Sequence, residues 1–186
     1  MYGRKKIKML CEGALLVALA QILSLLKVYE FPQGGSVTLA MLPVVLFATR
    51  WGLRAGLLGG FSFGILQLVF DGAYAWGWQS MIGDYILAFA VLGLAGIMCG
   101  KKHGFIWGCL IGSVARFLVH YVVGATIWAE YMPETFGGMA MTSPWFYSVL
   151  YNGAYMLPCA VATIIVAIIL DRLPTQRFTR GQDIAG

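Results

Sequence analysis

Long apolar runs set the strongest limit on how this chain folds. A helix needs about 20 predominantly apolar residues to cross the hydrocarbon core of a bilayer. The 186-residue chain is 60% hydrophobic and only 11% charged, with a mean hydropathy of +0.78. Soluble domains usually carry about 25% charged residues. The sequence therefore predicts an all-α integral membrane protein.

Six apolar segments are expected to cross the membrane and to form a single domain over residues 1–186. The predicted spans are residues 9–26, 37–49, 53–70, 80–99, 104–129 and 144–170. The second is short for a full crossing, so it is expected to tilt or to begin irregularly after Gly34 and Gly35. Basic residues precede the first span without an A-x-A-like cleavage site after it, so a retained first helix is expected.

The charges between the spans predict the orientation of the chain. All but two of the 13 lysines and arginines fall on one side, in the N-terminal segment, two short loops and the C-terminal tail with Arg177 and Arg180. The exceptions are Lys27, in an opposite loop, and Arg116, within a span. The opposite loops carry acids: Glu30, Asp71, Glu130 and Glu134. Both termini are therefore expected in the cytoplasm.

Several function classes are disfavoured by what the sequence contains. The net charge of +5 is divided into short clusters between apolar segments, which indicates topology-setting charges and no nucleic-acid partner. The four cysteines lie in apolar stretches without C-x-x-C spacing, so neither disulfides nor a metal site is expected. The chain has no G-x-x-x-x-G-K-[ST] phosphate loop. A partner is therefore expected to supply any energy for transport.

Seven polar or aromatic side chains are predicted at one depth, in the outer half of the spans. They are Asp84, Tyr85, Arg116, His120, Trp128, Tyr147 and Asn152. Charged groups are costly in hydrocarbon, so ionisable residues there indicate a functional site. Arg116, His120 and Trp128 are spaced i, i+4 and i+12, which places them on or near one helical face. The sequence predicts a binding pocket that opens to the exterior.

The residue types in this pocket favour a flat, cationic ligand. Trp128 can stack on a planar or cationic ring, and Asp84 can accept a hydrogen bond from an amino group or a protonated ring nitrogen. Asn152 offers both a donor and an acceptor to the edge of a heterocycle.

Other interpretations of the same residues stay open at this point. Asp84 and Arg116 could form a buried structural ion pair, and His120 could be a hydrogen-bonded core histidine. The aromatic residues could belong to an interfacial belt. A small membrane enzyme using Asp84 and His120 as acid and base is also possible, although no nucleophile accompanies them. A purely structural subunit is the remaining class.

Three stretches of the chain resemble a known family. They are KVYEFPQGGSVTLAMLPV (27–44), FDGAYAWGWQSMIGDYILAF (70–89) and SVLYNGAY (148–155). They are similar to the thiamine-specific substrate-binding subunit, or S component, of energy-coupling factor transporters. The resemblance covers most of the chain and implies capture of extracellular thiamine at the cell membrane, with no cofactor. An S component for another planar vitamin or precursor, such as riboflavin or hydroxymethylpyrimidine, is the alternative.

The resemblance also implies roles for the pocket residues. Asp84 would meet the aminopyrimidine of thiamine, Tyr85 would lie near the hydroxyethyl end, and Trp128 would stack against the thiazolium ring. Arg116 and His120 match a basic residue that is followed four positions later by histidine in the family. Tyr147 and Asn152 match a pair that helps to hold the pyrimidine.

The first span carries a motif of small residues, Ala14-x-x-x-Ala18, that permits close helix approach. It could serve internal packing or a partner helix. The motif resembles the family's docking surface for a membrane coupling subunit that carries two cytoplasmic ATPases. The family mechanism implies that the whole S component then reorients in the membrane. The loop over residues 27–36 lies on the outer side, where a mobile gate and an ordinary loop are both reasonable.

Overall fold

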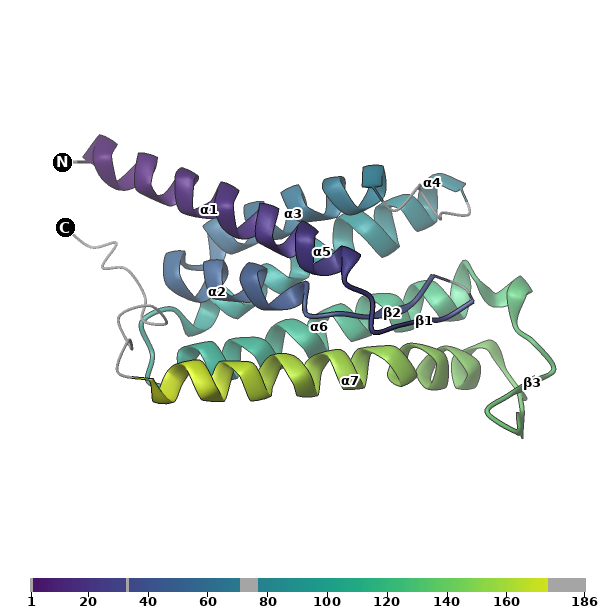
Figure 1. The fold of residues 1–186 in the computed structure, drawn as a ribbon. Helices are drawn as coiled ribbons and strands as arrows, with labels where there is room; N and C mark the ends of the chain where they lie inside the picture. Colours follow the sequence, from purple (N-terminus) through teal and green to yellow (C-terminus); the bar gives the residue numbers. More distant parts are fainter. Residues whose placement is uncertain (1, 33, 71–76, 174–186) are drawn as a thin grey trace.

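Long helices lie side by side along one axis and form nearly all of the regular structure (Figure 1). The structure is a computed structural model that describes residues 2–32, 34–70 and 77–173. Asp71, Arg177 and Arg180, which entered the orientation argument, lie outside these residues. The α-helices are α1 (Tyr2–Leu25), α2 (Met41–Trp51), α3 (Leu53–Phe70), α4 (Gly77–Ser80), α5 (Ala88–Ala90), α6 (Gly104–Thr126) and α7 (Pro144–Arg172).

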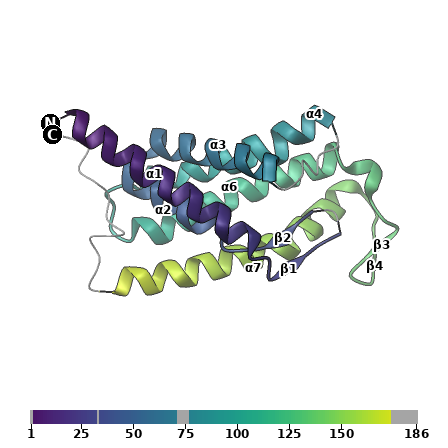
Figure 2. The same ribbon diagram turned by 45° about the horizontal axis from the view of Figure 1, so that its top comes forward.

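Short elements complete the bundle. A π-helix, η1 (Met81–Leu87), and a 3-10 helix, η2 (Val91–Met98), alternate with α4 and α5, and a second 3-10 helix, η3 (Ala129–Tyr131), follows α6. Two antiparallel hairpins lie between helices: β1 (Tyr29–Glu30) pairs with β2 (Ser36–Val37), and β3 (Thr135–Phe136) pairs with β4 (Met139–Ala140). Both hairpins lie at one end of the bundle, here called the hairpin end (Figure 2).

Five helical segments in the described residues are long and apolar enough to cross a membrane. They are Gly3–Leu25, Leu53–Phe70, Gly77–Met98, Gly104–Thr126 and Pro144–Arg172. The segment predicted at 53–70 coincides with the helix α3 at both ends. The first begins at Tyr2 and the last reaches Arg172, because charged residues continue a helix beyond its apolar part. The span predicted at 104–129 ends as an α-helix at Thr126.

The second predicted span differs most from expectation. It begins with β2 at Ser36–Val37, and α2 starts only at Met41, which confirms an irregular start. With 11 residues, α2 is about 16 Å long at the usual rise, too short to cross a bilayer core alone. All of its residues except Leu42 are buried. This helix therefore forms the interior of the bundle, and the longer helices surround it.

The span predicted at 80–99 consists of four consecutive helical pieces, of which the π-helical η1 carries Asp84 and Tyr85. Single turns of π-helix inside longer helices are frequent at functional sites. A glycine of α3 allows tight packing here, because a Cβ on Gly60 would collide with the carbonyl of Phe89. This close approach fixes η1 and α5 against α3.

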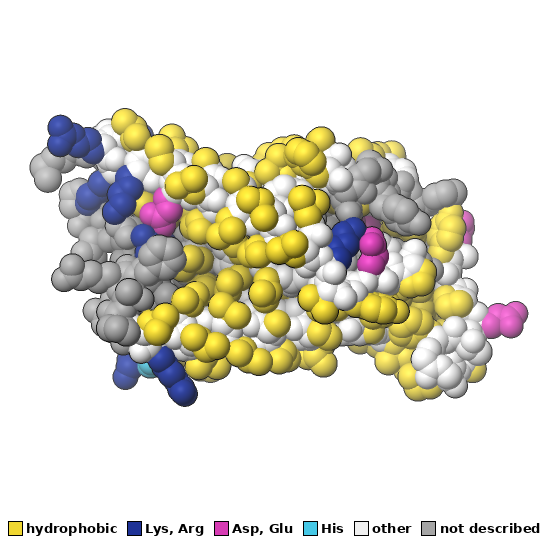
Figure 3. Space-filling view, viewed as in Figure 1, with side chains coloured by type: hydrophobic (Ala, Val, Ile, Leu, Met, Phe, Trp, Pro, Cys, Tyr) yellow, Lys and Arg dark blue, Asp and Glu magenta, His cyan; other side chains and the backbone are white. Residues whose placement is uncertain are grey.

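The surface of the bundle is apolar along its flank. Large aliphatic side chains are exposed on four helices: Leu15, Leu58, Leu118 and Leu157. The view in Figure 3 shows hydrophobic side chains as a broad band, with most of the visible Lys and Arg toward the end where α1 begins. Water would disfavour such a band, whereas a bilayer accommodates it. The last turn of α7 lies at the same end as the start of α1 (Figure 1).

Candidate ligand-binding cavity

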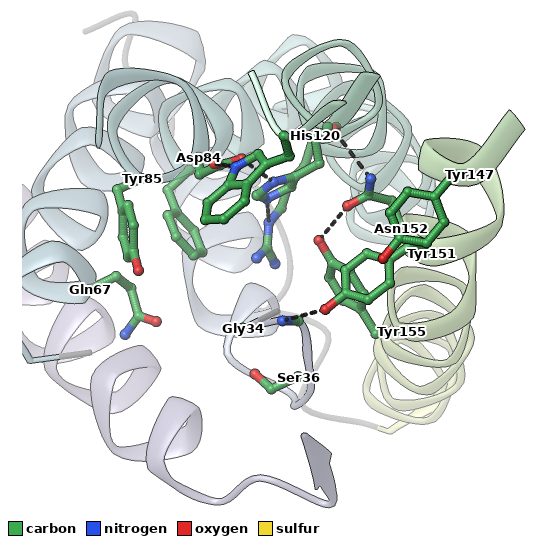
Figure 4. Close-up of a pocket in the computed structure, with 15 residues that line it drawn as sticks. Gly34, Ser36, Gln67, Asp84, Tyr85, His120, Tyr147, Tyr151, Asn152 and Tyr155 are labelled. Carbon is green, nitrogen blue, oxygen red and sulfur yellow. Dashed lines mark hydrogen bonds and ion pairs between the residues drawn. The ribbon is translucent and has the colours of Figure 1, made fainter. Parts of the chain in front are cut away.

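One cavity at the hairpin end is lined by all seven residues that the sequence singled out. The space inside it, together with solvent at its open mouth, is about 790 Å³. The lining comes from α3, the β1–β2 hairpin, η1, α5, α6, α7 and Trp128 (Figure 4). Residues from distant segments of the chain therefore line the same cavity. Their role in binding stays a prediction.

Asp84 is the centre of the polar network in this cavity. Its Oδ1 lies 3.0 Å from Nδ1 of His120, and its Oδ2 accepts a hydrogen bond of 2.8 Å from the indole Nε1 of Trp128. The π-helical turn of η1 brings the carboxylate to both residues, although His120 is on α6 and Trp128 follows it. Asp84 thus fixes the position of the Trp128 ring and places negative charge beside its edge.

The contacts of His120 define its tautomer. Nε of Arg116 donates to Nε2 of His120 over 3.3 Å, so Nε2 is the unprotonated nitrogen. The proton is then on Nδ1, which donates to Asp84. His120 is thereby neutral, with both ring nitrogens hydrogen-bonded. The chain of contacts runs from Arg116 through His120 to Asp84.

Arg116 does not pair directly with Asp84 in the described residues, so the simple structural ion pair is not observed. Its guanidinium carbon lies 4.3 Å from the ring centroid of Phe89, a cation–π geometry, and its Nε bonds to His120. His120 therefore separates the two charged groups. The Asp84 carboxylate has two neutral donors as partners, the imidazole of His120 and the indole of Trp128. It can therefore still attract a cationic ligand.

Asn152 is occupied by the protein itself. Its Nδ2 donates to the carbonyl of His120 over 3.3 Å and to the carbonyl of Ser148 over 2.9 Å, and its Oδ1 accepts from the Tyr155 hydroxyl over 2.8 Å. The amide thus ties α7 to α6 directly behind the His120 side chain. In this structure Asn152 orients the cavity wall, and only the second lone pair of Oδ1 is left for a ligand.

The β1–β2 hairpin covers one side of the cavity, where Gly34, Gly35 and Ser36 line it. The N–H of Gly35 donates to the Tyr151 hydroxyl over 3.4 Å. The Phe31 ring centroid lies 5.8 Å from that of Tyr151. The loop expected over residues 27–36 therefore contains a hairpin that packs on α7. Gln33 lies outside the described residues.

Sequence reasoning missed several lining residues. Tyr151 and Tyr155 follow Tyr147 at intervals of four, so the helical period alone could have identified them. Gln67 is a polar residue within the apolar run of α3, and the rule that selected Asp84 applies to it as well. Phe89 and Gly124 gave no such signal, because apolar and small residues are common in any span.

Ala14 and Ala18 lie on a face of α1 that is exposed in the described structure. Of the two uses considered for this motif, internal packing is therefore wrong. The face is free for lipid or for a partner helix.

The apolar bundle and its partly polar cavity define a multi-pass membrane protein with a candidate site for a small solute. The family model described as "Thiamine transporter protein (Thia_YuaJ)" matches residues 10–179. The chain belongs to this thiamine transporter family.

Relatives in three bacteria agree with this membership. The thiamine transporter ThiT of Bacillus subtilis is 32% identical over 181 residues, which cover 89% of this chain and 91% of that protein. ThiT of Lacticaseibacillus paracasei is 26% identical over 197 residues, covering 96% and 94% of the two chains. A solved structure of ThiT from Listeria monocytogenes superposes with a TM-score of 0.79 at 26% identity, covering 94% of this chain and 98% of that one. These relatives are named as transporters and not as enzymes.

Proposed function

We propose that this chain captures extracellular thiamine in the hairpin-end cavity, as the substrate-binding subunit of an energy-coupling factor importer. The hydrogen bond between Trp128 and Asp84 carries the proposal. A flat cationic ring stacked on Trp128 lies beside a carboxylate, and cation–π contact adds to that attraction. The ThiT relatives are named for thiamine, which has such a ring. Riboflavin is neutral and would lack the charge–charge attraction that a cationic ring gains from Asp84.

The proposed ligand contacts follow from the free capacity of each residue. Asp84 keeps unused lone pairs for the amino group of the pyrimidine, and the face of Trp128 is available for the thiazolium ring. Tyr85 and Tyr147 line the cavity with ring and hydroxyl. Arg116, His120 and Asn152 act mainly by holding Asp84 and the wall of α6 and α7 in position.

We also propose the orientation of the bundle. In this proposal the chain is one membrane domain, and α2 with the extended segment before it provides a sixth crossing. Both termini are then cytoplasmic, and the hairpin end with its cavity opens to the exterior. The gathering of basic residues near the start of α1 supports this orientation through the positive-inside rule.

The partner of this subunit is proposed from the exposed face of α1. Ala14 and Ala18 are small and exposed, so a helix of a membrane coupling subunit can approach closely there. That subunit would carry two cytoplasmic ATPases and supply the energy for import. Copurification of the tagged chain with such a module, lost in Ala14→Leu and Ala18→Leu variants that still bind thiamine, would support this assignment.

Equilibrium dialysis of the detergent-purified chain against labelled thiamine tests the proposed ligand. The proposal predicts saturable binding of one thiamine per chain, competed by unlabelled thiamine and not by riboflavin. Competition by hydroxymethylpyrimidine at equal concentration would assign the site to the precursor. Absence of thiamine binding by folded protein would refute the proposal.

A further inference from the structure

Gln67 of α3 lines the cavity beside Tyr85, on the side opposite the tyrosines of α7 (Figure 4). Its amide is held from behind by α1. Nε2 of Gln67 lies 2.8 Å from Oε1 of Gln21 and 2.8 Å from Oγ of Ser24. Ser24 is buried, and both glutamines are partly buried. Three polar side chains from two apolar helices therefore meet directly behind the cavity wall.

The Ser24 hydroxyl determines which way these amides face. Its Oγ donates to the backbone carbonyl of Gln21 over 2.7 Å, so its single hydrogen is already used. The Gln67 atom that contacts Oγ must therefore be a donor, which identifies it as Nε2. The other hydrogen of Nε2 is directed to Gln21, whose contacting atom must then be the acceptor Oε1.

The carbonyl oxygen of Gln67 is consequently turned toward the cavity. Figure 4 shows this oxygen directed toward the interior of the cavity and the nitrogen directed away from it. Within the described residues, the hydrogen bonds of the Gln67 side chain all involve Nε2. Oε1 is thus an oriented acceptor available to a bound molecule, and it cannot turn into a donor without breaking two hydrogen bonds.

We propose that Gln67 is a specificity-determining residue that selects a ligand with a free hydroxyl over the phosphate ester of the same molecule. The inference rests on the proposed thiamine function. The flat rings of thiamine would stack against Trp128 and the α7 tyrosines. Its hydroxyethyl group would then lie on the side of the cavity where Gln67 is. An O–H donates to Oε1, whereas an ionised phosphate offers only acceptors and would leave both groups unpaired.

The test compares the dissociation constants of thiamine and thiamine monophosphate in purified wild type, Gln67→Leu, Ser24→Ala and Gln79→Leu. Wild type is expected to prefer thiamine. Gln67→Leu should weaken thiamine binding about tenfold without weakening the binding of the monophosphate, so the preference for thiamine declines. Ser24→Ala leaves the lining intact but releases the amide, and should reduce the preference in the same direction by less. Gln79→Leu, exposed and outside the cavity, should behave as wild type.

The outcomes separate this inference from the proposed function. Suppose that wild type binds thiamine while Gln67→Leu and Ser24→Ala keep the preference for thiamine over its monophosphate, or lose affinity for both ligands equally. In either case Gln67 is structural and the inference is wrong. Equal affinity of wild type for both ligands also overturns it. If wild type binds neither ligand, the proposed function itself fails and the inference fails with it. Should Gln67→Leu not fold, the preference measured with Ser24→Ala decides.

Discussion

At the scale of single residues, Asp84 combines two tasks in the cavity. It holds the indole of Trp128 and the ring of His120, and it supplies negative charge for a cationic ligand. Charge-assisted hydrogen bonds are about twice as strong as neutral ones, so the affinity of the site depends on this group more than on any neutral neighbour.

Replacing Asp84 with Asn removes the charge and keeps the size of the side chain. We expect the dissociation constant of thiamine to rise about 10- to 100-fold, because hydrogen bonds to charged groups contribute about 1.5–3 kcal/mol. Titration of intrinsic tryptophan fluorescence with thiamine measures the change. Glu130→Gln, an exposed acid outside the cavity, is the matched control. Unchanged affinity in Asp84→Asn would remove Asp84 from the site.

Replacing Asn152 with Ala should lower the stability of the protein as well as its affinity. The change leaves the Tyr155 hydroxyl without its acceptor and removes the side-chain donor to the carbonyl of His120. Loss of buried hydrogen-bond partners costs about 1–3 kcal/mol. Thermal unfolding of the purified protein measures it, with the exposed amide variant Gln79→Ala as reference. Equal unfolding temperatures would mean that Asn152 does not tie α6 to α7.

The candidate site was largely predictable at this scale, because buried polar residues are conspicuous in an apolar sequence. All seven predicted residues line one cavity. Their connections were not predictable: the sequence suggested a pair of Asp84 with Arg116, whereas His120 lies between them. The hydrogen-bonding partners of a side chain depend on helix rotation, which residue types alone do not specify.

At the scale of elements, α1 is attached to α2 by a largely buried ion pair. Nε and Nη2 of Arg50 donate to the two carboxylate oxygens of Glu12, and the Arg50 side chain is 8% exposed. Removing one partner of a buried pair leaves an uncompensated charge. The pair therefore fixes the part of α1 around Glu12, next to the exposed Ala14.

Glu12→Gln should destabilise the protein by about 3 kcal/mol, because Arg50 then loses its charge-assisted hydrogen bonds to the Glu12 carboxylate. The surface pair between Lys27 and Glu30 provides the contrast, since its side chains are 28% and 54% exposed. Glu30→Gln is expected to change stability by about 1 kcal/mol at most. Reversible unfolding in mixed detergent measures both variants. Similar losses in the two would show that burial does not distinguish these pairs.

The β1–β2 hairpin depends on the absence of a side chain at Gly35. A Cβ there would lie 2.5 Å from the ring of Tyr155, so the hairpin would have to move away from α7. Gly35→Ala should therefore speed thiamine dissociation several-fold, which stopped-flow fluorescence measures. Gly153→Ala is the control, because a Cβ at Gly153 meets nothing within 4 Å. Equal dissociation rates in both variants would show that the hairpin does not retain the ligand.

Helix positions were more predictable than helix type. The span at 53–70 matched, since uninterrupted apolar residues both cross a bilayer and form a helix. The short α2 and the π-helical η1 were not predicted in that form. Both depend on contacts between helices, as the burial of nearly all of α2 illustrates. An apolar run in the sequence indicates only that the segment prefers hydrocarbon to water.

At the scale of the whole molecule, the bundle has a basic end and a hairpin end, and the proposed orientation follows from this polarity. In cells expressing a variant without its four native cysteines, Met139→Cys in β4 should react with a membrane-impermeant maleimide. Lys101→Cys, between η2 and α6, should react only after permeabilisation. The reverse pattern would invert the proposed topology.

A crystal structure with thiamine at saturating concentration tests the central claim most directly, because it locates the ligand. The account predicts one thiamine in the hairpin-end cavity, with its rings between Trp128 and the α7 tyrosines, its pyrimidine amino group near Asp84 and its hydroxyl at Gln67. Thiamine bound elsewhere, or an empty cavity in protein that binds thiamine in solution, would contradict the account.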